Sequence, residues 1–181
     1  MKYLILIFKL IVFTYLIYLL IFLVSDYDPS SSVYHPPFAI WIIDIINLYI
    51  HEAGHFFFKI FGRWMYFLGG SLFQCIVPFT LVIVAAKQNF TNASFAGFWL
   101  GESVINVSIY IKDAPFQKLH LISKGLIHDW HWLLSSNLDA AEPLGNIFFI
   151  VGIIICIVSI VVGIISSLSD FKRYAEPKYS D

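Results

Sequence analysis

The stretch Phe38–Phe61, FAIWIIDIINLYIHEAGHFFFKIF, decides the fold of this chain. It is long enough to cross a bilayer, because a helical span needs about 20 apolar residues. A polar pattern of the type H-E-x-x-H lies inside it, at positions 51 to 55. Ionisable side chains are expensive in hydrocarbon and are functional candidates by default. The stretch therefore predicts a membrane-embedded helix that carries a polar site.

The composition of the whole chain agrees with a membrane location. Of its 181 residues, 59% are hydrophobic and 13% are charged, whereas soluble domains carry about 25% charged residues. The formal net charge of -1 argues against a nucleic-acid partner. The two cysteines, Cys75 and Cys156, lie in apolar runs and are predicted to be small buried side chains rather than a disulfide.

Five apolar segments have the length of a membrane span, and a backbone in lipid must satisfy its own hydrogen bonds as a helix. We therefore expect an all-α, polytopic integral membrane bundle of about five transmembrane helices, forming a single domain over residues 1–181. A polar tail follows the last span and is expected to be loose. The predicted spans are residues 3–24, 38–61, 67–86, 95–111 and 145–168, and the tail is residues 169–181.

Two further features of the fold follow from the region around the fourth span. Gly97 and Gly101 form a G-x-x-x-G pattern, which permits close contact with another helix. After this span, Asp113-Ala114-Pro115 is typical of a helix start. Apolar residues then recur at helical spacing between Phe116 and Ile127, which predicts an interfacial helix lying on the membrane surface.

The first loop indicates an orientation. Residues 25–37 contain no Lys or Arg, so we expect this loop outside the cytoplasm and the N-terminus inside. The apolar run before the loop exceeds a signal-peptide core and has no small-residue cleavage site, which predicts a retained helix. Lys9 within it is expected to face a partner helix, where Glu102 is one candidate partner, or to reach the membrane interface.

The pattern His51-Glu52-Ala53-Gly54-His55 predicts a metal site. On a helix the two histidines are about 40° and about 6 Å apart, so they can share one metal ion. Glu52 is close enough to take a proton from a metal-activated water molecule. The spacing therefore predicts zinc (Zn2+) as cofactor and Glu52 as the catalytic general base.

A catalytic zinc ion usually has three protein ligands and one open position, so a third ligand is expected. The region after the fourth span reaches the same membrane face as the end of the histidine helix. It contains the preferred candidates, His128 and Asp129, one as a ligand and the other in support. The weaker candidates are His131, Asp139 and Glu102.

Three polar residues within the spans have two interpretations each. Asp44 lies two turns before His51 on nearly the same face, so it either orients a metal-binding ring or pairs with a neighbouring helix. Glu102 is expected to face the protein interior in a structural or supporting role rather than as a ligand. Gln74 is expected to form an interhelical hydrogen bond, the alternative being a contact with a substrate backbone.

The motif His51-Glu52-Ala53-Gly54-His55 in a membrane helix, followed by Phe61-Gly62 and a glycine-rich third span, resembles the site-2 protease class of intramembrane zinc metalloproteases. The resemblance covers spans two and three. It implies that His51 and His55 bind zinc and that Glu52 activates water. In that class an Asp in an L-D-G-type motif completes the site; the nearest match in this chain is Leu138-Asp139-Ala140, which departs from that motif.

The leading functional hypothesis is therefore an intramembrane zinc metallopeptidase. Its partners would be the lipid bilayer and a membrane-protein or peptide substrate, which must unwind locally before its peptide bonds become accessible. The alternative is a non-catalytic metal-binding membrane protein, such as a sensor, a transporter subunit or an inactive protease relative. The two differ in their need for Glu52, since only hydrolysis requires a general base.

Overall fold

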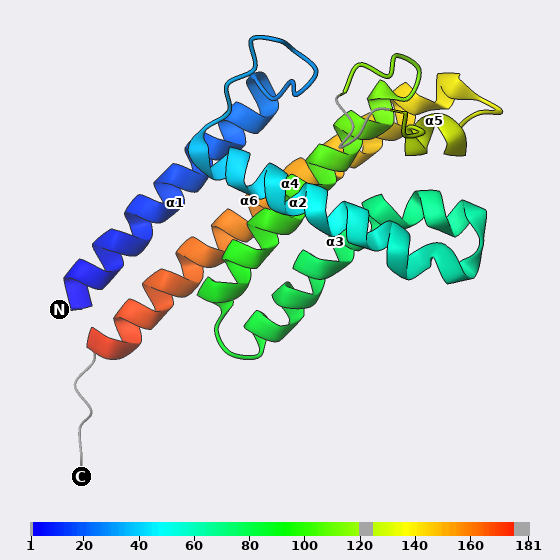
Figure 1. Cartoon of the computed structure of the whole chain (residues 1–181). Coiled ribbons are helices and arrows are strands. Elements are labelled where there is room, and N and C mark those ends of the chain that lie inside the picture. Colours follow the sequence, from blue (N-terminus) through cyan, green and yellow to red (C-terminus); the bar gives the residue numbers. More distant parts are fainter. Residues whose placement is uncertain (1, 120–124, 176–181) are drawn as a thin grey trace.

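The computed structural model describes residues 2–119 and 125–175 (Figure 1). Every regular element within these residues is helical, which confirms the predicted all-α class. The elements are α1 (Lys2–Ser25), α2 (Phe38–Phe58), η1 (Lys59–Phe61), α3 (Arg63–Ala86), α4 (Phe90–Asp113), α5 (Asp129–Leu133), η2 (Leu138–Ala140) and α6 (Ala141–Ala175).

Among residues 2–119 and 125–175, three helical segments are long and apolar enough to cross a membrane. They are Tyr3–Ser25, Arg63–Ala86 and Leu138–Arg173, which correspond to α1, α3 and α6 with its preceding turn. Helices α2 and α4 have the positions of two further predicted spans but are not among these three. The finding is consistent with a membrane protein, and the number of five spans stays a prediction.

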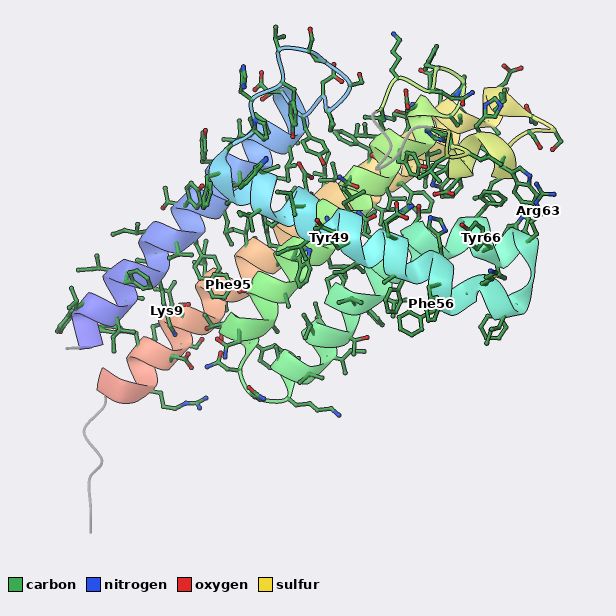
Figure 2. All side chains as sticks on the ribbon, in the orientation of Figure 1. Lys9, Tyr49, Phe56, Arg63, Tyr66 and Phe95 are labelled. Carbon is green, nitrogen blue, oxygen red and sulfur yellow. The ribbon has the colours of Figure 1, made fainter. Side chains whose placement is uncertain are left out.

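Helices α1, α4 and α6 lie roughly along one axis, with α6 antiparallel to the other two, whereas α2 runs across that axis (Figure 1). The beginning of α1 and the end of α6 lie at the same end of the bundle. Lys9 lies at this end of the bundle (Figure 2). It forms an ion pair with Asp170 at 3.3 Å, and the rings of Tyr3 and Phe171 lie 5.2 Å apart. Lys9 therefore faces a partner helix, as predicted, but its partner is Asp170 rather than Glu102.

Helices α4 and α6 pack closely because small residues face each other. A Cβ atom added at Gly101 would lie 2.8 Å from the carbonyl oxygen of Gly152, so no larger residue fits without movement. The predicted close contact of the G-x-x-x-G pattern is thereby confirmed. Cys156 lies in the same interface and is buried, as predicted, whereas Cys75 is only partly buried; both cysteines are free.

The predicted interfacial helix is wrong in the part that the structure describes. Residues 114–119 contain turns and a bend, and residues 126–128 have no regular secondary structure. The cause is Asp113, the last residue of α4, whose carboxylate accepts the backbone N–H groups of Lys118 and Leu119 at 2.9 Å each. These bonds close a loop where a helix would need to continue. The remaining part of that prediction, residues 120–124, lies outside the described residues.

The prediction of a loose tail is also wrong over its first half. Helix α6 continues to Ala175, well past the predicted end of the last span at residue 168. The ion pair between Asp170 and Lys9 and the contact of Phe171 with Tyr3 attach these added turns to α1. Residues 176–181 lie outside the described part of the chain.

Candidate metal centre

Side chains from α2 and α5 meet at one point. His51 Nε2 lies 2.9 Å from Asp129 Oδ2, and His55 Nε2 lies 3.3 Å from the same oxygen. All three residues are almost fully shielded from solvent. They form a group whose ligand atoms lie within 4.8 Å of one another and could hold a metal ion. The loop region between α4 and α6 thus reaches the histidine helix, as the sequence predicted.

The other nitrogen of each ring fixes which atom carries the hydrogen. His51 Nδ1 lies 3.3 Å from the side-chain oxygen of Gln74, and His55 Nδ1 lies 2.7 Å from the backbone oxygen of Tyr66. Carbonyl oxygens only accept, so both Nδ1 atoms donate. In a neutral ring the lone pair is then on Nε2, the atom that faces Asp129.

This arrangement has two chemical solutions. If both rings are neutral, two nitrogen lone pairs point at a carboxylate, and a cation between them turns the repulsion into coordination. If the rings are protonated, the same contacts are ion pairs. Zinc bonds of about 2.0–2.1 Å in a tetrahedral site hold neighbouring ligand atoms about 3.3 Å apart. The observed separations of 2.9 and 3.3 Å fit such a site.

Glycines let α3 approach the histidine helix. A Cβ atom at Gly54 would lie 2.8 Å from the backbone carbonyl carbon of Gly69, so the two helices touch through their backbones. A Cβ atom at Gly70 would overlap the His51 ring, with its Cε1 at 2.7 Å. Gly54 of the H-E-x-x-H pattern therefore lets α3 approach α2, and Gly70 of α3 leaves the space that the His51 ring occupies.

Asp129 is held by contacts on both sides of it. The Tyr110 hydroxyl group of α4 donates to Asp129 Oδ2 at 3.2 Å and accepts the backbone N–H of Asp129 at 3.1 Å. The next residue, Trp130, donates its indole N–H to Ser71 Oγ on α3 at 3.0 Å. The ring of Trp132 stacks on Phe67 with a centroid distance of 4.3 Å. Helix α5 is thus fixed against α3 and α4.

The charge state of Asp129 suits a cation. Burial tends to raise the pKa of its carboxyl group, but when the two rings are protonated the hydrogen bonds and charges of His51 and His55 outweigh burial and hold that pKa below its usual value. Asp129 is therefore ionised at neutral pH. Burial lowers the pKa of the neighbouring His128, and the nearby carboxylates of Asp113 and Asp129 only partly offset this effect.

A pocket of about 260 Å³ opens beside the three ligand atoms. Glu52 lines it and makes no hydrogen bond or ion pair with any residue that the structure describes. Figure 2 shows Tyr66, which also lines the pocket, near the start of α3 and close to the end of α2 that carries Phe56. The apolar part of the lining is Phe67, Leu126 and Ile127. The Glu52 carboxylate and the rings of His51 and His55 thus line one cavity.

The predicted third-ligand candidates have separate positions. Asp129 joins the histidines, whereas His128 begins α5, where its Nδ1 accepts the backbone N–H of His131 at 3.2 Å. His128 Nε2 lies 3.3 Å from Asp113 Oδ2, without hydrogen-bond geometry. His131 Nδ1 lies 2.9 Å from the backbone oxygen of Ala114.

The two remaining candidates also lie outside the group. Asp139 is an exposed residue of η2. Glu102 is fully buried and accepts a hydrogen bond from Asn47 Nδ2 at 2.7 Å, in agreement with its expected internal role. Within the described residues, the group that could hold a metal ion therefore consists of His51, His55 and Asp129.

Two contributors to the site were not among the predicted residues. Tyr110 had a signal in the sequence, because it lies four residues after Asn106 and eight after Glu102 and so continues their polar stripe on α4. Tyr66 contributes a backbone oxygen. No side-chain pattern predicts that contribution, since every residue has a backbone carbonyl.

Comparison with known protein families, curated proteins and solved structures finds no match for this chain.

Proposed function

We propose that this chain is a membrane-embedded zinc metallopeptidase. His51, His55 and Asp129 hold the zinc ion, and Glu52 is the general base. The observation that carries the proposal is the convergence of both Nε2 atoms on the Asp129 carboxylate while both Nδ1 atoms donate to carbonyl oxygens. Metal-binding histidines are commonly fixed in this way by an acceptor on the second nitrogen.

A four-span arrangement fits the packing. In this arrangement, which departs from the predicted five spans, helices α1, α3, α4 and α6 cross the membrane, and α2 lies across them with the metal centre near its C-terminal end. The contacts of Lys9 with Asp170 and of Tyr3 with Phe171 support an even number of spans, because they bring the two ends of the chain to one face. If the N-terminus is cytoplasmic, the metal centre faces the opposite side of the membrane.

The residues of the pocket divide the work of peptide hydrolysis. Zinc supplies a Lewis acid that activates water and polarises the peptide carbonyl group. Glu52 accepts a proton from the attacking water and returns it to the leaving amine, and its carboxylate has no competing hydrogen bond in the described structure. Tyr110 keeps Asp129 in place through two hydrogen bonds.

The shape of the pocket favours an apolar, unwound peptide segment. The ligand atoms and Glu52 form a polar region, while Phe67, Leu126 and Ile127 provide apolar contacts beside it. Leu126 and Ile127 are 49% and 53% exposed, so they are available to a chain that enters from the membrane. A segment that leaves its own helix in lipid needs other partners for its backbone groups, and this site offers polar groups in reach of water.

Metal removal tests the proposal. In membranes that contain the chain, labelling of protein N-termini followed by mass spectrometry is expected to detect new termini within apolar segments of membrane proteins. These termini should disappear when 1,10-phenanthroline is added and return with added zinc. Membranes without the chain are the control. An identical set of termini with and without the chain would contradict peptidase activity and favour a non-catalytic metal-binding protein.

A further inference from the structure

A chain of hydrogen bonds leads from the metal centre into the bundle. Beyond His51, Gln74 Nε2 donates to Asn106 Oδ1 at 2.9 Å. Asn106 Nδ2 donates to Asp44 Oδ1 at 3.1 Å and to the Tyr27 hydroxyl oxygen at 2.6 Å. The Tyr27 hydroxyl group in turn donates to Asp44 Oδ1 at 2.6 Å. The chain therefore runs from a ring nitrogen of His51 to the carboxylate of Asp44.

Each residue in this series of hydrogen bonds can donate and accept in only one direction. Asp44 Oδ1 accepts two hydrogen bonds, so the NH₂ group of Asn106 must face it and the Asn106 oxygen must face Gln74. The NH₂ group of Gln74 then donates to Asn106, and the Gln74 side-chain oxygen accepts from His51 Nδ1. That oxygen keeps the hydrogen on His51 Nδ1 and leaves the lone pair on Nε2.

We propose that Asp44 is a positioning residue of the metal centre, because through Asn106 and Gln74 it fixes the tautomer in which His51 Nε2 can bind a metal ion. This inference rests on the proposed zinc site. It also unites the two interpretations of Asp44: the residue pairs with neighbouring segments, and by doing so it orients a metal-binding ring without touching it. Partners of metal-binding histidines typically affect metal affinity by about 10–100-fold.

Removal of the Asp44 carboxylate is expected to reverse the donor and acceptor roles in this series of hydrogen bonds. In Asp44→Leu the Tyr27 hydroxyl hydrogen loses its acceptor and turns to Asn106, whose amide rotates to present its oxygen. Gln74 follows and presents its NH₂ group to His51 Nδ1. The ring then carries its hydrogen on Nε2, the atom that should bind zinc.

Zinc affinity of the purified full chain, measured by competition with a chromophoric chelator, tests this positioning role. Asp44→Leu is expected to weaken zinc binding about tenfold, the lower value for a supporting partner. In a Gln74→Glu background the same substitution should cause no loss, because a carboxylate accepts the hydrogen of His51 Nδ1 in either orientation. Tyr34→Phe is the matched control. It removes a 3.4 Å hydrogen bond to Asp44 Oδ2 that is not part of the series leading to His51.

Asn106→Leu provides a second variant with the same logic, should Asp44→Leu not fold. Its loss of zinc affinity should likewise vanish in the Gln74→Glu background. An equal loss in both backgrounds would show that Asp44 and Asn106 act on packing alone, which overturns the positioning role and leaves the zinc site standing. If His51→Leu binds zinc as tightly as the unmodified chain, the zinc site and the positioning role are both overturned.

Discussion

Glu52→Gln is expected to abolish peptide cleavage while the protein still binds one zinc ion. The amide has nearly the shape of the carboxylate but cannot accept a proton, and a general base contributes about 10²–10⁴-fold to a rate. Glu52 lines the pocket without a hydrogen bond to any described residue, so the substitution should leave the surrounding contacts unchanged. New N-termini in membranes and the zinc content of the purified variant are the two measurements.

Glu142→Gln is the matched control for this substitution. Glu142 is exposed in the first turn of α6, outside the pocket, so cleavage and zinc content should equal those of the unmodified chain. If Glu52→Gln produces the same new N-termini as the unmodified chain, Glu52 is not the general base. The proposed peptidase mechanism then fails even if zinc is bound.

The second large effect concerns the third ligand. Asp129→Ala should weaken zinc binding by more than about 100-fold, beyond the usual cost of losing a supporting partner of a ligand. The substitution removes the oxygen on which both histidines converge and leaves their Nε2 atoms without an anionic neighbour in the group. Competition with a chromophoric chelator measures the affinity directly.

His128→Ala separates a ligand from a residue that supports it. His128 begins α5 and its Nδ1 accepts a backbone N–H, so its loss should lower stability by about 1 kcal/mol, as for other helix caps, and leave zinc bound. Thermal unfolding and zinc content give the two readouts. Full zinc affinity in Asp129→Ala together with its loss in His128→Ala would reverse the assignment of the two residues.

The spacing of residues along one helix was sufficient to predict part of this site. The positions of His51 and His55 follow from helical geometry alone, and loop connectivity was enough to bring the region of His128 and Asp129 to the same end. The choice between those two residues was not accessible to the sequence. It depends on the start of α5 and on the hydrogen bonds of Tyr110 and Trp130, which exist only after α3 and α4 have packed.

The failed prediction of an interfacial helix has a local cause. The apolar spacing between Phe116 and Ile127 favours a helix, but the Asp113 carboxylate binds the N–H groups of Lys118 and Leu119 and closes a loop instead. Side-chain acceptors of this kind compete with helical hydrogen bonds. Periodicity describes which face a residue would occupy and contains no information about such a competitor.

The proposed link from Asp44 to His51 could not be predicted from the spacing of residues within α2. Helical spacing put Asp44 on the same face as His51 but two turns away, too far for contact. Its connection passes through α3 and α4, by way of Gln74 and Asn106. A pattern within one helix cannot predict a path that leaves it.

Zinc X-ray absorption spectroscopy of the purified full-length protein tests most directly whether two histidines and one carboxylate hold a zinc ion. We expect one zinc ion per chain with two imidazole ligands and oxygen ligands, all at about 2.0–2.1 Å. A third imidazole, a sulfur shell at about 2.3 Å, or a chain purified in zinc-containing buffer without bound zinc would contradict it.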